Sequence, residues 1–225
     1  MDNEIDISIH DLTIHDKTKE LHPNLATVPF NMIMVAKSGG GKTNLIVNIC
    51  RMYNKIFKNR VLVFTKSRNG TLHSLEKSIG TNIFNENDNV IERTMAFQKS
   101  QKEQGKKLKN ILVILDDWIT DKSLNTRRNI YDKLFSMGRH ANISVIITTQ
   151  QYTLLPATIR RLAWYCCLFK ISNTAERKIM ISEMCNCIDK NETEFEQIYN
   201  DATAEPYSFL FINAKNNKFT TRFGK

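Results

Sequence analysis

Short runs of apolar residues alternate along the chain with longer polar segments that have helical spacing. The clearest run, Ile111–Leu115, consists entirely of branched aliphatic residues. Similar runs occupy residues 30–35, 61–64, 144–148 and 164–171. A continuous apolar run predicts a strand that is covered on both faces, as in a parallel sheet.

The segments between these strands carry helix signals. Residues 43–53 place Leu45, Ile46 and Ile49 along one face, and a second helix is predicted over residues 126–137. Gly138 directly follows that second helix, and we expect it to cap the helix in a left-handed conformation. Farther on, Asn173 and Glu176 have the spacing of a capping box at the start of another helix.

The end of the chain has the pattern of a hairpin. Two apolar or β-branched runs, residues 209–212 and 218–221, flank the polar turn at residues 215–217. Strands that alternate with helices predict an α/β fold, here with a mostly parallel central sheet flanked by helices and a C-terminal β-hairpin. We expect residues 1–28 to be a lead-in segment and residues 29–225 to form a single domain.

The net positive charge of the chain suggests a polyanionic partner. The chain has 225 residues, a formal net charge of +9 and a pI of about 9.3. An excess of this size is typical of proteins that bind a polyanion, although a solvated basic surface is the alternative. Residues 71–109 are polar and partly helical in pattern, and they end in a lysine-dense segment broken by Gly105.

The cysteines indicate a reducing compartment. Their number is five, none lies in a CxxC pair, and no histidine stands at a metal-ligand spacing beside them. We therefore expect buried thiols and an intracellular location rather than a disulfide framework. No apolar run approaches the roughly 20 residues of a membrane span, so no membrane role is expected.

A glycine-rich loop joins the first strand to the first helix. In the stretch VAKSGGGKTNL, residues 36–43 match the Walker A pattern with Ala36 in place of the usual first glycine. Glycines allow successive backbone N–H groups to point at a phosphate, and the helix that follows adds its positive end. The candidate nucleotide-binding residues are Ala36, Lys37, Ser38, Gly39, Gly40, Gly41, Lys42, Thr43 and Asn44.

Within this loop, Lys42 is expected to reach the β- and γ-phosphates and Thr43 to bind Mg²⁺. Asp116 and Asp117 follow the strand Ile111–Leu115, at the end where open parallel sheets place their ligands. Asp116 fits a Walker B acid that holds Mg²⁺ through water, and Asp117 fits the acid that orients or deprotonates the attacking water.

Gln150 follows the strand at 144–148 and can sense the γ-phosphate, although a polar strand end is a common alternative. No Asn-Lys-x-Asp motif for reading guanine occurs, so ATP is the expected nucleotide, with Mg²⁺.

Four stretches of this chain together resemble one family. VPFNMIMVAKSGGGKTNL, ILVILDDW, FSMGRHANISVIITTQQYTLLPATIR and the final hairpin look like the genome-packaging ATPases of poxviruses and other large or virophage-type DNA viruses. These enzymes belong to the FtsK–HerA superfamily of P-loop DNA pumps. The resemblance covers roughly residues 28–222 in the same order, and the GRH…IS…TTQ block is its most specific part.

The resemblance implies a sheet with further strands inserted between the P-loop strand and the usual place of the Walker B strand. It also implies a homo-oligomeric ring, a pentamer or hexamer, that drives double-stranded DNA into a preformed capsid in the host cytoplasm or virion, with capsid proteins as partners. Rings of this kind supply an arginine in trans. Arg139 is the first candidate for that role, with Arg160 and Arg161 as alternatives.

Other classes remain open at this level. A cellular or plasmid DNA pump or helicase of the same superfamily would share the catalytic site. A degenerate P-loop protein could bind nucleotide only as a switch, although intact Lys42, Thr43, Asp116 and Asp117 argue against that. A small-molecule kinase would need an acceptor pocket and usually an arginine-rich lid.

Overall fold

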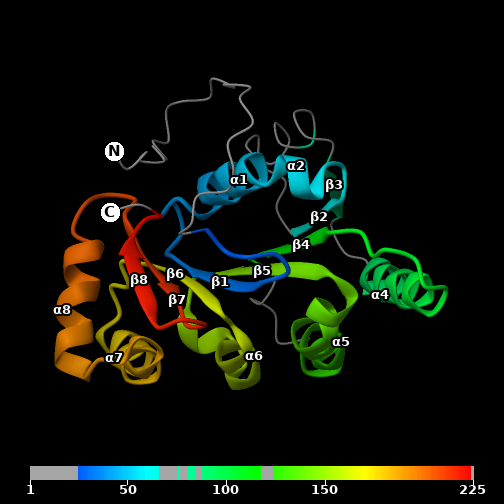
Figure 1. Cartoon of the computed structure of the whole chain (residues 1–225). Helices are drawn as coiled ribbons and strands as arrows, with labels where there is room; N and C mark the ends of the chain where they lie inside the picture. The colour runs from blue at the N-terminus through cyan, green and yellow to red at the C-terminus, as the bar shows by residue number, and fades with distance from the viewer. Residues whose placement is uncertain (1–24, 66–75, 77–80, 85–87, 118–123, 224–225) are drawn as a thin grey trace.

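Eight strands form one sheet across the described part of the chain, in the order β3-β2-β4-β5-β1-β6-β7-β8 (Figure 1). The structure, a computed structural model, describes residues 25–65, 76, 81–84, 88–117 and 124–223. Neighbouring strands from β3 to β6 in this order are parallel, whereas β7 and β8 are antiparallel. The predicted α/β fold with a mostly parallel sheet and a terminal hairpin is confirmed.

All the predicted strands are present, and one strand was not predicted. The strands are β1 (Asn31–Val35), β2 (Val61–Thr65), β3 (Asn82–Phe84), β4 (Ile111–Asp116), β5 (Ile143–Thr149), β6 (Tyr165–Phe169), β7 (Phe209–Asn213) and β8 (Lys218–Thr221). β3 escaped prediction because only Ile83 among its three residues is buried, which gives no readable pattern. β5 lies between β1 and β4, the insertion that the family resemblance implies.

The helices cover both faces of the sheet. They are α1 (Lys42–Met52), α2 (Asn54–Phe57), α4 (Asp88–Glu103), α5 (Leu124–Met137), α6 (Ala157–Leu162), α7 (Thr174–Met184) and α8 (Glu192–Ala202). α1 and α2 lie over one face, and α4, α5, α6 and α7 lie over the other (Figure 1). Short 3₁₀ helices cover Gly138–Ala141, Tyr152–Leu154 and Cys185–Ile188.

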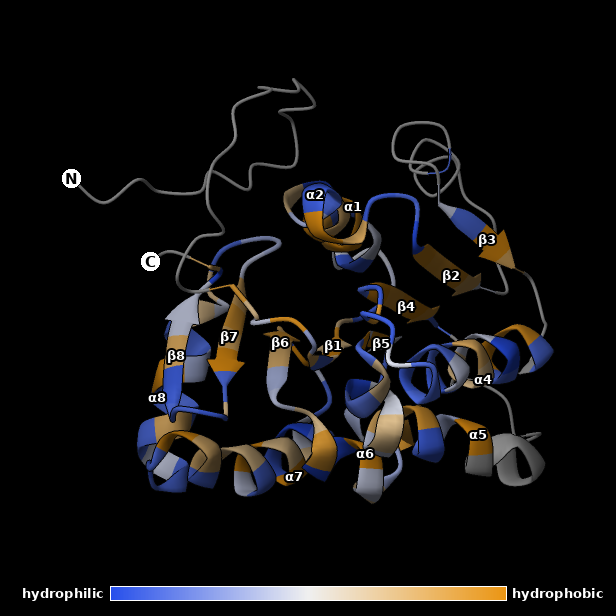
Figure 2. Cartoon of the chain, turned by 45° about the vertical axis from the view of Figure 1, so that its right-hand side comes forward, coloured by the Kyte–Doolittle hydropathy of each residue, from blue (hydrophilic) through white to orange (hydrophobic). Residues whose placement is uncertain are grey.

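Alternate residues of each strand face alternate layers. In β1, Ile33 and Val35 pack in the cluster under α5 and α7, whereas Met32 and Met34 pack in the cluster with α1 and α2. Hydrophobic colour accordingly dominates β2, β4 and β7, whereas the edge strand β8 is mostly hydrophilic (Figure 2). Because both faces are covered, polar side chains can leave the central strands only at their ends.

The prediction for Gly138 is wrong. The chain continues past α5 as a right-handed 3₁₀ turn, and Gly138 does not adopt a positive φ. The left-handed residue is Asn142, with a φ of 57°. Asn142 suits that position because its amide donates to the side-chain oxygen of Asn110 at 2.7 Å, and its N–H donates to the carbonyl of Arg139 at 3.1 Å.

The predicted capping box at Asn173 is present only in part. The Asn173 side chain accepts the hydrogen bond from the N–H of Glu176 at 3.1 Å. The Glu176 carboxylate, however, accepts from the backbone N–H of Tyr152 instead of reaching back to Asn173. A complete capping box occurs at α8, between Asn191 and Glu194. Residues 1–24 of the predicted lead-in segment lie outside the described residues.

The five cysteines are free thiols, and four of them are buried. Burial raises the pKa of the Cys50 thiol to about 12, so this thiol is protonated at neutral pH. Cys187 is the half-buried exception to the predicted burial. Among the helices of the described segments, none combines the length and the apolar character that crossing a membrane requires.

Tyr199 of α8 ties this helix to the carboxyl end of β6. Its hydroxyl donates to the carbonyl of Phe169 at 2.7 Å and accepts from the N–H of Ile171 at 2.7 Å, and the side chain is buried. Tyr199→Phe should therefore lower the free energy of unfolding by about 1–3 kcal/mol, because two buried backbone groups lose a partner. Urea unfolding monitored by circular dichroism measures this change.

Tyr207→Phe is the matched control, because the side chain of Tyr207 is exposed. It should leave the unfolding free energy within about 0.5 kcal/mol of the wild type. An equal effect of the two substitutions would contradict the tie at Tyr199.

Candidate functional site

The loop between β1 and α1 is shaped for an anion to approach its backbone. Gly41 caps α1 in the left-handed region, with a φ of 100°, and supplies no side chain to the free N–H groups of the first turn. A Cβ at Gly40 would lie 2.9 Å from the carbonyl oxygen of Lys37, closer than a side chain tolerates. The first-turn N–H groups of the helix are thus left open to bind an anion.

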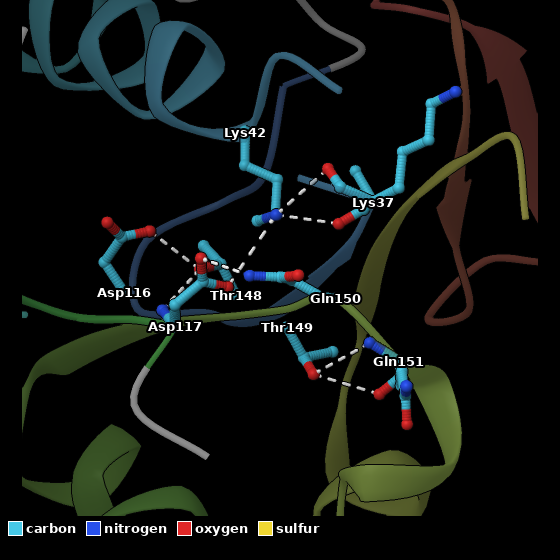
Figure 3. Close-up of polar contacts among 9 residues, drawn as sticks. Lys37, Lys42, Asp116, Asp117, Thr148, Thr149, Gln150 and Gln151 are labelled. Carbon is cyan, nitrogen blue, oxygen red and sulfur yellow. Dashed lines mark hydrogen bonds and ion pairs between the residues drawn. The ribbon is translucent and has the colours of Figure 1, made fainter. Parts of the chain in front are cut away.

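Lys42 closes the inner side of this loop. Its ammonium donates to the carbonyl of Ala36 at 2.7 Å and to that of Lys37 at 3.3 Å (Figure 3). The same nitrogen lies 3.7 Å from Oδ1 of Asp117. The side chain is only 6 % exposed, so its charge acts at the loop and not in bulk water.

The two predicted acids lie beside this lysine. Asp116 is the last residue of β4 and is buried, whereas Asp117 is partly exposed and adopts a φ of 47°. That left-handed conformation turns the chain at the strand end, so the two carboxylates do not simply alternate across the sheet. Asp117 faces Lys42 on one side and Gln150 on the other (Figure 3).

Gln150 reaches the acid pair from the neighbouring strand. It follows β5, and its side-chain amide donates to Oδ2 of Asp117 at 3.2 Å. Three predicted residues that follow three separate strands therefore lie together at the carboxyl edge of the sheet. They are Lys42, Asp117 and Gln150. A neutral amide and a carboxylate so arranged can together orient a water molecule.

Thr148 is a site residue that the sequence pattern did not reveal. It is fully buried within β5, and its hydroxyl donates to Oδ1 of Asp116 at 2.8 Å. The hydroxyl oxygen of Thr148 also accepts a hydrogen bond from the backbone N–H of Asp117 at 2.9 Å. One hydroxyl thus positions both acids. Its only sequence signal is a polar residue at the end of the aliphatic run Val145–Ile147.

Burial raises the pKa of the Asp116 carboxyl above its ordinary value. The hydrogen bond from Thr148 acts in the opposite direction, the charge of Asp117 raises the pKa further, and the charge of Lys42 lowers it. A buried carboxylate favours a cation nearby, and among the described residues Thr148 is the hydrogen-bond donor to its Oδ1. Asp116 thus has the chemistry of a ligand for a hard divalent ion.

The predicted arginines do not join this cluster. Arg139 lies in the 3₁₀ turn before β5, at the amino edge of the sheet, opposite the phosphate loop. Its guanidinium carbon stacks 3.4 Å from the ring centroid of Trp164, and burial lowers its pKa from the ordinary value. Its Nε is buried without a hydrogen-bond partner among the described residues.

The alternative arginines differ in how firmly they are held. Arg160 donates from Nε and Nη2 to the two oxygens of Glu183, both at 2.7 Å, and from Nη1 to the carbonyl of Leu155. All three guanidinium nitrogens of Arg160 therefore donate a hydrogen bond within its own chain. Arg161 is exposed, and its Nε donates to the carbonyl of Ala157 at 3.3 Å.

Comparison with known proteins identifies relatives among viral proteins. A sequence model of the family described as "Poxvirus A32 protein" matches residues 18–215. The DNA packaging protein OPG160 of Vaccinia virus (strain Copenhagen) is 28% identical over 159 residues, which are 66% of this chain and 56% of that protein. The OPG160 protein of Variola virus is also 28% identical, over 162 residues. The chain thus spans little more than half the length of these curated relatives.

Solved structures share the fold at lower identity. B204, described as the DNA-packaging ATPase of Sulfolobus turreted icosahedral virus, has a TM-score of 0.62 at 16% identity, covering 89% of this chain and 98% of B204. EssC (ATPases 2 and 3) of Geobacillus thermodenitrificans has a TM-score of 0.62 at 14% identity, covering 87% of this chain and 39% of EssC. At these identities, the comparison establishes a common fold.

The bridging hydroxyl of Thr148 can be tested through the stability of the protein. Thr148→Val keeps the side-chain shape and removes a hydrogen bond to a charged group, so it should lower the unfolding free energy by about 1.5–3 kcal/mol at neutral pH. The pKa of Asp116 should then rise further. When the pKa of a group is higher in the folded state than in the unfolded state, the group contributes its full stability only at pH values below the unfolded-state pKa. That contribution is lost as the pH rises through the folded-state pKa.

The deficit of Thr148→Val should therefore be larger at about pH 7 than at about pH 4, where the carboxyl of Asp116 is protonated in part. Urea unfolding at the two pH values measures the difference, and Thr148→Ser, which retains the hydroxyl, should behave more like the wild type. A deficit independent of pH would show that Thr148 matters only for packing.

Proposed function

The chain belongs to the poxvirus A32 protein family, and from this premise we propose that it is an ATP-hydrolysing motor that moves double-stranded viral DNA into a capsid. The observation that carries the proposal is the meeting of Lys42, Asp117 and Gln150 next to an open phosphate loop. The names of the OPG160 relatives, DNA packaging proteins, agree with this assignment. Such a motor acts in the virus factory or virion of an infected cell.

The residues of the loop would hold the phosphates. The N–H groups at the start of α1 would bind them through the backbone, and Lys42 would exchange its bonds to Ala36 and Lys37 for the β- and γ-phosphates. The ion pair of Lys42 with Asp117 would lengthen as the phosphate takes the lysine. Asn44, in the first turn of α1, stays a predicted nucleotide-binding residue.

Asp116 and Thr43 are the proposed holders of Mg²⁺. The buried carboxylate of Asp116, with its raised pKa, suits a divalent cation, which would favour its ionised form. No group of three or more His, Cys, Asp or Glu that could hold a metal occurs among the described residues. That fits Mg²⁺, which binds through one or two protein oxygens and the phosphates themselves and neutralises the charge on those phosphates.

Asp117 and Gln150 would act on the attacking water. Gln150 orients the water through its amide, and Asp117 accepts the proton as the oxygen bonds to the γ-phosphorus. The bond from that phosphorus to the β–γ bridging oxygen breaks, which yields ADP and phosphate. Thr148 keeps the two acids in place through the step by bonding to both.

The amino edge of the sheet offers a surface for DNA. Lys102, Lys106, Lys107 and Lys109 are exposed along the end of α4 and the connection to β4. The buried amide of Gln98 donates to the carbonyls of Lys109 and Ala141, at 2.6 and 2.8 Å, so the lysine segment and the turn of Arg139 lie side by side. Clustered positive charge on one edge is suited to phosphate contacts without base reading.

An arginine in trans would complete the site. Arg139 and Arg160 contact Trp164 and Glu183 rather than the acid pair of their own chain, so a neighbouring subunit of the proposed ring would have to present either of them there. Arg139 remains the first candidate because its Nε has no hydrogen-bond partner among the described residues. Arg160 is the weakest candidate, because Glu183 and the carbonyl of Leu155 already take up its guanidinium.

The ATPase rate with and without double-stranded DNA tests the proposed function. We expect DNA to stimulate the wild type and Lys42→Ala to abolish turnover with and without DNA, because the γ-phosphate loses its main cation. Stimulation should weaken as the salt concentration rises, because DNA binding weakens. In a plot of the logarithm of the binding constant against the logarithm of the salt concentration, each neutralised phosphate contributes about −0.9 to the slope. A rate indifferent to DNA at low salt would contradict the motor.

The trans arginine is tested by mixing inactive subunits. Arg139→Ala should bind ATP normally and hydrolyse it on the order of a thousandfold more slowly. In mixed rings with Lys42→Ala subunits, an intact loop meets an intact Arg139 on its neighbour, so part of the ATPase rate should return.

Arg161→Ala, mixed in the same way, is the matched control. Arg139→Lys should keep the positive charge over Trp164 but lack the planar guanidinium, whose paired N–H groups can bind two phosphate oxygens at once. Recovery with the Arg161 variant alone would transfer the role to Arg161.

A further inference from the structure

An exposed aromatic side chain lies against the phosphate loop, on the side away from the acids. The side chain of Tyr207 is 55 % exposed in the connection between α8 and β7. A Cβ built at Gly41 would lie 3.3 Å from Cδ1 of Tyr207. The ring therefore packs on the last glycine before α1, at the same edge of the sheet as the nucleotide site.

The backbone of Tyr207 is held in an unfavourable conformation. The N–H of Ser208 donates to the carbonyl of Glu205 at 3.2 Å, which closes a turn with Pro206 in its second position and Tyr207 in its third. The φ of Tyr207 is 60°. A turn of this kind, type II, favours glycine at that position, and a bulky residue there is an uncommon, strained choice.

Side-chain contacts fix this turn in place. Arg222 donates from Nη2 to the hydroxyl of Ser208 at 3.3 Å and lies 3.8 Å from a carboxylate oxygen of Glu205. The next strand, β7, starts at Phe209, which pairs with Phe169 at the end of β6. These contacts hold the backbone of Tyr207 in its strained conformation.

The position of Tyr207 relative to the acids follows from the strand order. β1 lies between β5, which leads to Gln150 and adjoins the acids of β4, and β6, which adjoins β7 and Tyr207. Lys42 contacts Asp117 on the first side, and Gly41 contacts Tyr207 on the second. A nucleotide with its γ-phosphate at the acids and its other phosphates along the loop would place its base on the second side.

We propose that Tyr207 is the base-stacking residue of the nucleotide site, its exposed ring forming the platform for the adenine. This assignment rests on the proposed function, because it presumes a nucleoside triphosphate in the phosphate loop. The aromatic face of tyrosine offers a large flat surface to a purine, and stacking depends little on which purine is bound. The strain at Tyr207 is then explained by the exposed ring that this residue brings to Gly41, where the neighbouring ring of Phe169 is buried.

The test compares a ligand that has a base with one that has none. Calorimetric titrations of the full chain use the non-hydrolysable ATP analogue AMPPNP and inorganic tripolyphosphate, both with Mg²⁺. Tyr207→Gly should weaken AMPPNP binding about tenfold, as expected for the loss of one stacked base, and leave tripolyphosphate binding unchanged. Tyr207→Phe should bind both ligands as the wild type does.

Tyr207→Gly also separates stacking from folding. Glycine is favoured at a positive φ, so the midpoint of urea unfolding should not fall. Phe97→Ala, which removes a similarly exposed ring from α4 (54 % exposed), is the matched control and should change neither affinity.

Unchanged AMPPNP affinity in Tyr207→Gly, or an equal loss for both ligands, would overturn the stacking role alone. A wild-type chain that binds neither ligand would overturn the proposed function, and the stacking role with it.

Discussion

Burial of the central strands on both faces is the constraint on which the site depends. β1, β4 and β5 are fully buried along their length, so their polar neighbours in sequence can reach solvent only where the strands end. Since the three strands are parallel, their carboxyl ends lie at one edge. The lysine after β1, the acids at the end of β4 and the glutamine after β5 converge there as a consequence of packing.

The same burial creates an electrostatic problem at that edge. The carboxyl of Asp116 is buried next to a second acid, and both features raise its pKa. The hydroxyl of Thr148 and the charge of Lys42 act against them. The site is therefore poised so that a cation would relieve repulsion between the acids, and the ion pair between Lys42 and Asp117 stands where an anion is expected to enter.

The two edges of the sheet differ in chemistry. The carboxyl edge carries the candidate phosphate loop, the acids and the ring of Tyr207, whereas the amino edge carries Arg139 on Trp164 and the lysine segment after α4. One edge is thus suited to a nucleotide and the other to a polyanion or a neighbouring subunit. Strands such as β4 and β5, which span the sheet from edge to edge, are the rigid connection between them.

Local rules in the sequence were enough for seven of the eight strands in the described sheet, and they singled out Lys42, Asp117 and Gln150 as candidate site residues. Aliphatic runs identified the buried strands, and the loop from Ala36 to Thr43 and the acid pair predicted a phosphate site, because the chemistry of each depends on neighbours in sequence. Local spacing failed where a distant partner competed: Glu176 bonds to Tyr152 rather than completing its cap, and Asn142 takes the left-handed position expected of Gly138.

Tertiary structure alone decided the rest. Thr148 bridges the acids only because β5 lies in register beside β4, and Tyr207 meets Gly41 only because β7 folds back along β6. Sequence cannot reveal such contacts, since strand order sets them across more than 30 and 160 residues of chain, respectively. The sequence by itself determined which residues could do chemistry, and the pairing of strands determined which of them meet.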